Sequence, residues 1–505
     1  MSVLTEFLEA NAERLGDRTA LVHGTTRLGH RELRDRVLEL ARGLGAAGVE
    51  PGDCVLLALP NGPEFVQAFL AVGAAGGGAM LLDPQSKESE LGYALRDCEP
   101  RVVVTDARGA TRCRELAANL GRQPVIVSLG EPPTGAIGLA ELAGLGDGAG
   151  LPAEAPDEPI LYQFSSGSTG RPKRVARTRR HLWIETLMLR DSLALSEEDA
   201  ILCAIPLYHA YGLGSCVQAA LGSGATLVFQ ESPQPFALKR GRTLELIEQE
   251  SVTIFPAVPY MVELLAEAPF DADLSRIRYC YTAGAKLSAA AFAAFDARFG
   301  VAVRQMYGCT ESPSITLNLD VDPRPTAGSV GRPLGDVQVI VYGEDGDELP
   351  PGVPGEVGVI SPVAAIAYVS GARPDQQTFR GGKIFAGDLG MLDEEGRLTL
   401  VGRTKTLIDV RGRKVDPLEV EDVLVTHPAV EEAVVVGDRI GGSQVEVIKA
   451  AVVVADACTE RELIRYCKER LAPYKVPQVV EFRDAIPRSP IGKVLRKELI
   501  EWAGA

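Results

Sequence analysis

The residues best suited to chemistry form a loop behind a short apolar segment. Ile160–Phe164 predicts a strand, and it runs directly into the string SSGSTGRPK, which ends at Lys173. Glycines let backbone N–H groups surround anionic oxygens, hydroxyls donate further hydrogen bonds, and a lysine offsets negative charge. The string therefore predicts a phosphate-binding loop. The residues expected to contact phosphate are Ser165, Ser166, Gly167, Ser168, Thr169, Gly170 and Lys173.

This string has a second interpretation. Segments rich in serine and glycine are also typical of flexible surface turns. The pattern also differs from the common GxxxxGK nucleotide loop, because Pro172 stands where that loop needs glycine. The loop's composition alone leaves both a phosphate site and a surface turn open.

The elements that would position this loop alternate between helix and strand periods. Cys54–Leu59 is a short apolar run that predicts a buried strand. Alternation of this kind favours a largely parallel sheet with helices on its faces. The stretch 130–159 is rich in glycine, proline and alanine and predicts a surface connection. One helical face before the strand is formed by Leu33, Val37, Leu40, Ala41 and Leu44.

The pattern changes after Gly402 and predicts a small separate α+β domain. The overall prediction is an α/β protein with a large N-terminal domain of helix-flanked sheets over residues 1–403 and a small mobile α+β domain over residues 404–505. The elements expected in the small domain are a strand at Thr406–Val410, a helix beginning near Pro417, strands at Val430–Gly437 and Val445–Val454, and a helix at Thr459–Leu471.

Composition excludes several classes of function. The 505 residues carry a net charge of −16, so there is no global positive field to attract nucleic acid or an anionic membrane. The long uncharged windows 65–82 and 200–230 contain too many glycines and polar residues for a membrane span. The acidic N-terminal segment does not fit a signal peptide, and the nine scattered cysteines form no CxxC pair. We expect a cytoplasmic protein with reduced thiols that acts on small molecules.

Further motifs follow the loop in a fixed order. Together they resemble the adenylate-forming superfamily, which includes acyl- and aryl-CoA ligases, adenylation domains and firefly-type luciferases. The resemblance extends over essentially the whole chain. The five motifs are YQFSSGSTGRPK at 162–173, MYGCTES at 306–312, FAGDLG at 385–390, VGRTKTLIDVRGRKVDPLEVE at 401–421 and PRSPIGKVLRKEL at 487–499.

The resemblance implies a reaction and a role for each motif. Similar proteins attack the α-phosphate of Mg·ATP with a carboxylate, release pyrophosphate, and pass the acyl group of acyl-AMP to a nucleophile. By this resemblance the Thr310 hydroxyl contacts phosphate, the Glu311 carboxylate holds Mg²⁺ and Tyr307 lies against adenine. Asp388 accepts hydrogen bonds from the ribose hydroxyls, and Arg403 is its partner. Extra negative charge develops on phosphate oxygens in this reaction, so cations and oriented donors are the expected catalysts.

Three residues of the predicted small domain, Lys405, Gly412 and Lys493, have implied roles in a two-step cycle. Lys493 matches the mobile lysine that bridges the carboxylate and the α-phosphate during adenylation, whereas Lys173 neutralises the pyrophosphate end. Lys405 occupies the hinge position, and Gly412 falls in the loop that faces the thiol tunnel after rotation of the small domain. The alternative for the hinge is a flexible linker without functional rotation.

The acid to be activated is predicted from the segment that begins at Pro206. Adenylation domains for α-amino acids resemble one another in having an aspartate near this segment, but no Asp or Glu lies between Asp199 and Glu231. We therefore expect that the acid is not an α-amino acid. His209 followed by Gly212 resembles the HxxG element of acyl- and aryl-CoA ligases, at the wall of the acyl pocket and thiol tunnel. An aromatic or medium-sized hydrophobic acid is expected, with fatty and aryl acids both open. The implied acyl-pocket residues are Tyr211, Gly214, Ala283, Gly284, Met306, Ser314 and Ile315.

The chain departs from the family pattern in places that concern the acceptor. Arg174 replaces a usual glycine, Thr178-Arg179 replaces a Thr-His pair, and Ala386 replaces a threonine. We expect CoA as the acceptor, with a free amine or the thiol of a separate carrier protein as alternatives, since no carrier domain follows Ala505. A non-catalytic acyl- or nucleotide-binding protein is the alternative from another class.

Overall fold

The computed structural model describes residues 3–146, 148, 150–153, 155–165, 173–230, 236–369, 377–403, 408–410, 413–415, 417–438, 447–488 and 494–500. Contacts between residues divide the chain into two compact units. The first comprises residues 1–339 and 359–384, and the second comprises residues 340–358 and 385–505. Residues 404–407 lie outside the described part, and the predicted domain boundary between 403 and 404 stays a prediction.

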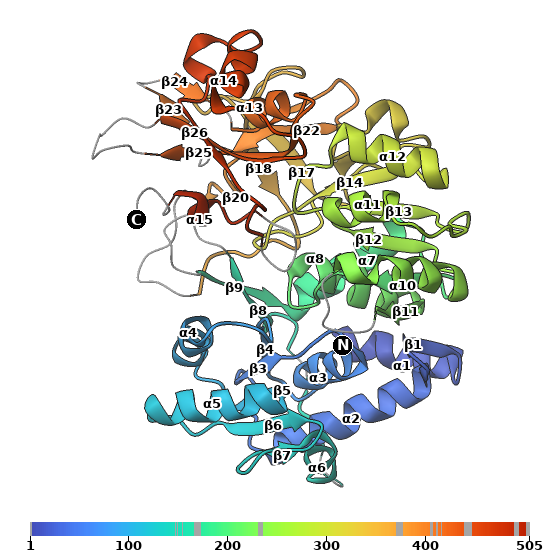
Figure 1. The fold of residues 1–505 in the computed structure, drawn as a ribbon. Coiled ribbons are helices and arrows are strands. Elements are labelled where there is room, and N and C mark those ends of the chain that lie inside the picture. Colours follow the sequence, from blue (N-terminus) through green and yellow to red (C-terminus); the bar gives the residue numbers. More distant parts are fainter. Residues whose placement is uncertain are drawn as a thin grey trace. The chain divides into compact units, whose positions relative to one another are not determined.

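The first unit contains a sheet whose last two strands precede and follow the predicted phosphate loop in the chain (Figure 1). Its strands pair in parallel except for the last two, which are antiparallel with Ser165 opposite Lys173. The predicted strands at 54–59 and 160–164 are therefore confirmed. In the described part of the chain the order is β7 (Ile137–Gly138), β6 (Val125–Leu129), β5 (Val102–Asp106), β3 (Cys54–Ala58), β4 (Gly78–Leu81), β8 (Pro159–Ser165) and β9 (Lys173–Thr178).

A second sheet of the first unit carries the other predicted site residues. Its central strands are parallel, and its edges pair antiparallel. The prediction of largely parallel sheets is confirmed. The described strands follow the order β16 (Arg332–Pro333), β15 (Thr316–Leu317), β14 (Val303–Tyr307), β13 (Tyr279–Thr282), β12 (Ile254–Ala257), β10 (Ala200–Cys203), β11 (Thr226–Phe229), β1 (Thr19–His23) and β2 (Thr26–Gly29).

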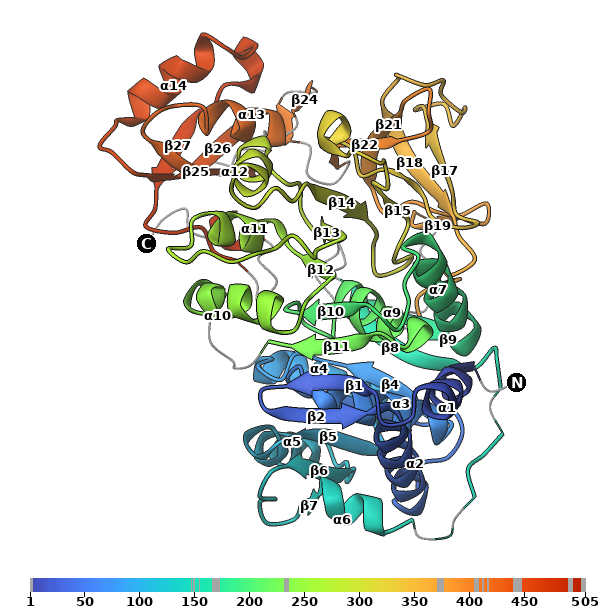
Figure 2. The same ribbon diagram turned by 90° about the vertical axis from the view of Figure 1, so that its right-hand side faces the viewer.

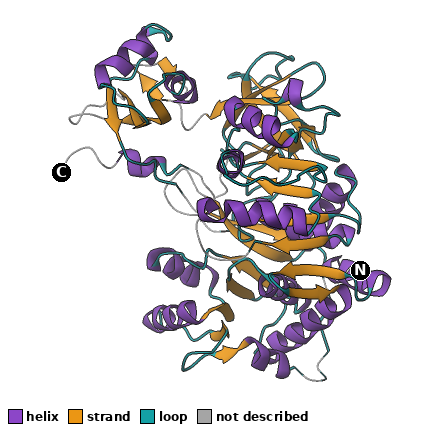
Figure 3. Ribbon diagram, turned by 45° about the vertical axis from the view of Figure 1, so that its right-hand side comes forward, coloured by secondary structure: helices purple, strands orange, loops and turns teal. Residues whose placement is uncertain are grey.

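Helices cover the sheets of this unit, as Figure 3 shows in purple beside the orange strands. Helix α3 (Pro63–Ala74) contacts strands of both sheets and so lies between them. Helices α10 (Phe236–Gln249), α11 (Pro259–Ala266) and α12 (Ala289–Phe299) follow one another along the second sheet (Figure 2). The helices are α1 (Val3–Leu15), α2 (His30–Ala46), α3 (Pro63–Ala74), α4 (Glu88–Cys98), α5 (Ala107–Asn119), α6 (Leu139–Gly144), α7 (Arg179–Ser192), α8 (Ala210–Gly212), the π-helix η1 (Leu213–Gln218), α9 (Ala219–Ser223), α10 (Phe236–Gln249), α11 (Pro259–Ala266), α12 (Ala289–Phe299) and the 3-10 helix η2 (Arg324–Thr326).

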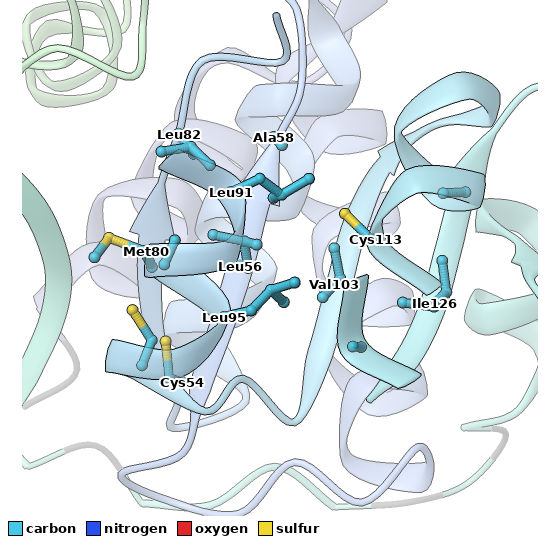
Figure 4. Packing of buried hydrophobic residues seen from close by; sticks show 14 residues of the cluster. Cys54, Leu56, Ala58, Met80, Leu82, Leu91, Leu95, Val103, Cys113 and Ile126 are labelled. Carbon is cyan, nitrogen blue, oxygen red and sulfur yellow. The ribbon is translucent and has the colours of Figure 1, made fainter. Parts of the chain in front are cut away.

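Apolar periodicity explains how helices and strands meet in the core. All five predicted apolar positions of α2 are buried, and every residue of β3 is buried because helices cover both faces of its sheet. On the other face of this sheet, Leu91 and Leu95 of α4 point toward Leu56 and Val103 of the strands (Figure 4). The helical face predicted before Cys54 is therefore confirmed.

The predicted surface connection at 130–159 is partly wrong. It contains β7 and α6, and Leu142 of α6 is buried. Short elements of two and six residues leave little periodic signal, which explains why composition dominated the prediction. No helix within the described residues is long and apolar enough to cross a membrane.

The second unit contains the small α+β fold predicted for the C-terminal part. Its helices pack on a three-stranded sheet around a buried cluster of aliphatic residues. The helix expected near Pro417 begins there, and Thr459 caps the helix expected at 459–471. The elements are β23 (Ile408–Val410), β24 (Arg413–Val415), α13 (Pro417–Leu424), β25 (Val430–Asp438), β26 (Val447–Val454), α14 (Glu460–Lys468), the 3-10 helix η4 (Pro473–Lys475), β27 (Val479–Phe482) and α15 (Arg496–Ile500).

A further group of short strands precedes this fold. Within it, the last two strands form an antiparallel hairpin that belongs to the second unit. The predicted fold class, an α/β protein with a small α+β C-terminal domain, is confirmed. The remaining strands are β17 (Gln338–Tyr342), β18 (Gly355–Ile360), β19 (Phe379–Arg380), β20 (Lys383–Ile384), β21 (Asp388–Leu392) and β22 (Leu398–Arg403).

Candidate active site

One tyrosine of the first unit joins three predicted site residues. The Nζ atom of Lys173 lies 4.8 Å from the centroid of the Tyr368 ring. The Tyr368 hydroxyl donates a hydrogen bond to Oε1 of Glu311, and the Ser165 hydroxyl lies close enough to offset part of the rise that burial causes in the pKa of Tyr368. The structure therefore gathers a hydroxyl, a cation and a carboxylate around one aromatic side chain.

The backbone beside β9 fixes the position of this tyrosine. Tyr368 forms an antiparallel bridge with Val175, and the N–H of Val369 donates to the Arg174 carbonyl at 2.8 Å. The Phe379 ring meets the tyrosine ring edge-on at 5.0 Å between centroids. Nothing in the sequence around Tyr368 indicated this role, because the contact joins segments almost two hundred residues apart.

The Tyr368 hydroxyl remains a hydrogen-bond donor across the ordinary pH range. Burial, followed by the nearby negative charge of Glu311, raises the pKa of Tyr368 above its usual value. A protonated phenol can donate to the carboxylate, and this holds Glu311 in a defined orientation.

Thr310 and Glu311 lie in a closed loop between β14 and β15. The N–H of Ile315 donates to the Tyr307 carbonyl at 2.9 Å, and Cys309 N–H donates to the Ser312 carbonyl at 3.1 Å. Glu311 is 8% exposed, and its carbonyl accepts from Ala365 N–H at 2.8 Å. The loop thus presents a hydroxyl and a carboxylate from a backbone held at both ends.

The segment that leads to His209 is held by two polar side chains of the first unit. Asn61 accepts from Leu207 N–H at 2.9 Å and donates to the Ile205 carbonyl at 2.8 Å. Gln163 donates to the Tyr208 carbonyl at 2.9 Å. These contacts place His209 at the start of α8, with its ring 4.5 Å from that of Tyr208.

Gly212 of the HxxG element is required by a close backbone approach. A Cβ atom at this position would stand 2.1 Å from the Pro206 carbonyl oxygen. Any side chain would therefore displace the turn that carries His209. The spacing of histidine and glycine in this element has a direct structural cause.

The predicted acyl-pocket residues come from three segments of the first unit. The Tyr211 hydroxyl lies 3.0 Å from the Ala257 carbonyl oxygen and 3.1 Å from that of Tyr281, and burial raises its pKa. Gly284 has φ +85°, a conformation that favours glycine. The other members lie on η1, directly after β13, and along the strand and loop at 306–315; they are Gly214, Ala283, Met306, Ser314 and Ile315.

The carboxylate of a buried ion pair accepts hydrogen bonds from two of these segments. Arg177 of β9 and Glu185 of α7 have side chains 1% and 0% exposed, and Nη2 of the arginine lies 2.7 Å from Oε2 of the glutamate. Gln218 donates to the same oxygen at 3.0 Å, while the Ser314 hydroxyl donates to Oε1 at 2.8 Å. A Cβ at Gly214 would stand 3.0 Å from Oε1.

The sequence argument about acidic residues missed Glu185. That argument covered only the segment between Asp199 and Glu231, whereas this carboxylate comes from the preceding helix. One signal was present: Arg177 falls on the same face of β9 as buried Val175, so an inward arginine required a buried partner. Arg177 offsets the charge of Glu185, so the carboxylate is already paired.

The departures from the family pattern around β9 have structural partners. Arg174 lies 3.2 Å from a carboxylate oxygen of Asp97, and Arg179 donates to the Gly73 carbonyl at 2.7 Å. Thr178 and His181 form a capping box at the start of α7. Arg174 and Arg179 therefore fasten β9 and α7 to the helices α4 and α3.

The predicted ribose-binding pair lies in the second unit. Asp388 begins β21 and faces Arg403 at the end of β22 in the antiparallel register. Nε of Arg403 donates to Oδ1 of Asp388 at 2.5 Å. The aspartate is 6% exposed, whereas the arginine side chain is 45% exposed. The predicted partnership of these two side chains is present as an ion pair.

Several predicted residues lie outside the described part of the chain, and their roles stay predictions. They are Ser166, Gly167, Ser168, Thr169, Gly170, Lys405, Gly412 and Lys493.

Comparison with known proteins supports the class that this fold and these motifs define. The AMP-binding enzyme family matches residues 8–369, and the AMP-binding enzyme C-terminal domain matches residues 419–493. A feruloyl-CoA synthase from Amycolatopsis sp is 34% identical over 492 residues, with 95% of each chain covered.

Two solved structures show the same fold. An anthranilate CoA ligase in complex with anthranoyl-AMP has a TM-score of 0.87 and 26% identity, with 98% of this chain and 96% of that chain covered. The amide bond synthetase McbA from Marinactinospora thermotolerans has a TM-score of 0.85 and 29% identity, with 99% and 100% covered.

Fold, motif order and site geometry define an adenylate-forming, ATP-dependent ligase. The chain belongs to the AMP-binding enzyme family. The predictions of an enzyme and of activation through an acyl adenylate are confirmed at this level.

Proposed function

We propose that the protein activates an aryl or similar hydrophobic carboxylic acid with ATP and Mg²⁺ and transfers the acyl group to CoA. The observation that carries the proposal is the cluster of Ser165, Lys173 and Glu311 around Tyr368, because it combines groups suited to phosphate and to a cation. The feruloyl-CoA synthase and the anthranilate CoA ligase support an aromatic acid.

In the first step, a carboxylate oxygen attacks the α-phosphorus of ATP. The new oxygen–phosphorus bond forms as the bond to the bridging oxygen of pyrophosphate breaks, and pyrophosphate leaves. Lys173 offsets charge on the leaving phosphates, and Lys493 offsets charge on the reacting oxygens. Asp388 and Arg403 orient the ribose, and Tyr307 supports adenine.

The donor set fits Mg²⁺. The Glu311 carboxylate and the Thr310 hydroxyl are hard oxygen ligands on adjacent residues, and Mg²⁺ is usually held by one or two carboxylates with phosphate oxygens and water. The ion would supply positive charge to the phosphates. Tyr368 uses one lone pair of Oε1, and a carboxylate offers about four such sites.

In the second step, a thiol sulfur attacks the carbonyl carbon of acyl-AMP. The carbon–sulfur bond forms, the thiol loses its proton, and AMP leaves. We propose that the small domain rotates about Lys405 between the two steps and that His209 lies at the meeting point of acyl pocket and thiol tunnel. The expected cytoplasmic location stays a prediction.

An amine acceptor is the second candidate. The likeness to the amide bond synthetase, over essentially the full length of both chains, favours it. In that case nitrogen replaces sulfur as the nucleophile, and every residue assigned to adenylation keeps its role.

The test is pyrophosphate release across aryl, fatty and amino acids, with mass detection of products after addition of CoA or a simple amine. Acid-dependent pyrophosphate followed by an acyl-CoA mass is the expected result. Amide without thioester would replace only the acceptor. Absence of acid-dependent pyrophosphate with every acid would overturn the proposal.

A further inference from the structure

Ser314 has a backbone conformation that is unfavourable for serine. Its φ is +56°, in the left-handed region that residues other than glycine rarely adopt. The residue is 4% exposed, so hydrogen bonds to solvent do not offset the cost of this backbone conformation. Such a conformation persists only where surrounding contacts determine it, and the Ser314 side chain makes one such contact.

That contact is the hydrogen bond to Glu185. The Ser314 hydroxyl donates to Oε1 at 2.8 Å, across 129 residues of sequence. The acceptor is held rigidly, because Oε2 accepts from Arg177 at 2.7 Å and from Gln218 at 3.0 Å. Three donors therefore converge on the two oxygens of one fully buried carboxylate.

Ser314 also closes the loop that carries Thr310 and Glu311. It directly precedes Ile315, whose N–H donates to the Tyr307 carbonyl. A Cβ at Gly308 would stand 2.9 Å from the Ser314 nitrogen, so the two ends of the loop are in close contact. A change in the conformation of Ser314 would therefore shift the loop backbone.

We infer that Glu185 is a positioning residue for adenylation: through its hydrogen bond it holds Ser314 in the left-handed conformation and thereby sets the loop of Thr310 and Glu311. This inference rests on the proposed function. Glu185 acts through Ser314 and, through Gln218, also fastens η1, which carries predicted acyl-pocket residues.

Glycine at position 314 provides the decisive test. Glycine adopts positive φ readily, so Ser314→Gly removes the need for an anchor. Glu185→Gln weakens the anchor, because an amide offers one acceptor oxygen to three donors. Acid-dependent pyrophosphate release is measured for the wild type, for each single variant and for the double variant.

Glu185→Gln is expected to lower kcat about 10- to 100-fold in the Ser314 background, because small displacements of reacting groups cost rates of this size. In the Ser314→Gly background the same change is expected to cost about threefold or less, a departure from additivity that reports coupling between the two positions. Equal losses in both backgrounds would overturn the inference.

A third variant separates positioning from folding. Replacement of both charges by Arg177→Met with Glu185→Leu removes the buried ion pair without leaving one charge alone. The Arg177→Met, Glu185→Leu double variant is expected to unfold near the wild-type temperature and still to lose the greater part of kcat. Wild-type kcat in this folded variant would also overturn the inference, whereas wild-type enzyme without acid-dependent pyrophosphate release would instead remove the proposed function.

Discussion

The hydroxyl of Tyr368 donates a hydrogen bond to Glu311, while the ring of Tyr368 lies 4.8 Å from the Lys173 ammonium. One side chain thus contacts an anion through its polar end and a cation through its aromatic face. The ends of the phosphate loop and the loop of the proposed metal ligand are connected by this residue.

Tyr368→Phe keeps the ring beside Lys173 and removes the hydrogen bond to Glu311. We expect a loss of about 1.5–3 kcal/mol in the free energy of unfolding, since one hydrogen bond to a charged group is removed. We expect kcat/KM for pyrophosphate release to fall about tenfold, with a higher Mg²⁺ concentration at half-maximal rate. Tyr342→Phe is the control, because its hydroxyl contacts Glu348 at an exposed position of the second unit. Equal kinetics for Tyr368→Phe and wild type would contradict the role of this hydrogen bond.

Asp388→Asn should weaken ATP binding. The variant keeps the size of the side chain but removes the charge that pairs with Arg403 and is expected to accept from ribose. An increase of about tenfold in the Kd for ATP, measured by calorimetry, corresponds to the loss of one charge-assisted hydrogen bond. The control is Asp393→Asn at the turn of the same hairpin, where the carboxylate pairs with Arg397. Equal ATP affinity of both variants would remove the ribose role.

Lys493→Ala should separate the two half-reactions. The lysine is expected to act only when the acid attacks phosphorus, so pyrophosphate release should fall by about 10²-fold or more. Thioester formation from synthetic acyl-AMP and CoA should remain within about threefold of the wild type, because this step makes no use of that charge. Lys497→Ala controls for loss of a nearby cation. Undiminished pyrophosphate release would end the assignment of Lys493.

Arg177→Met should destabilise the fold more than the paired change Arg177→Met with Glu185→Leu. The single variant leaves the buried Glu185 carboxylate without its cation, which costs about 3–5 kcal/mol, whereas removal of both charges is often close to neutral. Chemical denaturation of the full chain measures the difference. A single variant as stable as the double variant would show that the carboxylate finds another partner.

Two histidines should make stability fall as the pH is lowered. Burial lowers the pKa of both His30 and His181 from 6.5 to about 4, and the positive charge of Arg177 adds to the effect at His181. Between pH 6.5 and 4 the unfolded chain binds protons that the folded chain does not, so the free energy of unfolding decreases toward pH 4.

The measurement is the unfolding temperature at several values between pH 7 and 4. His181→Gln keeps a side chain able to complete the capping box with Thr178 but removes one titrating group. Its unfolding temperature should therefore depend less steeply on pH. Parallel curves for this variant and the wild type would contradict the contribution of His181.

Local pattern predicted those parts of the molecule whose positions depend on near neighbours. The apolar face of α2, the strand β8 before the phosphate loop and the helix at Pro417 all follow from periodicity or capping within a few residues. Motif order then indicated the class of enzyme and paired Asp388 with Arg403, which face each other across one hairpin.

Contacts between distant segments could not be predicted in this way. Tyr368 meets Glu311 across 57 residues, and Glu185 meets Ser314 across 129. Separations of this size leave no local periodicity, and each contact depends on how the sheets place separate strands and helices. The anchors of the site are therefore visible only in the folded chain.

The π-helix η1 holds Gly214 in a turn that is wider than an α-helical turn. Such a turn corresponds to one inserted residue, and an α-helix advances by about 100° per residue. Because the wider turn already accommodates that residue, deletion of a single residue from Leu213–Gln218 is expected to restore an α-helical turn, to keep α9 in phase and to shift the backbone mainly around Gly214, a predicted acyl-pocket residue. If Gly214 lines the acyl pocket as predicted, a change in chain length at η1 would alter the pocket locally and leave the following helix in place.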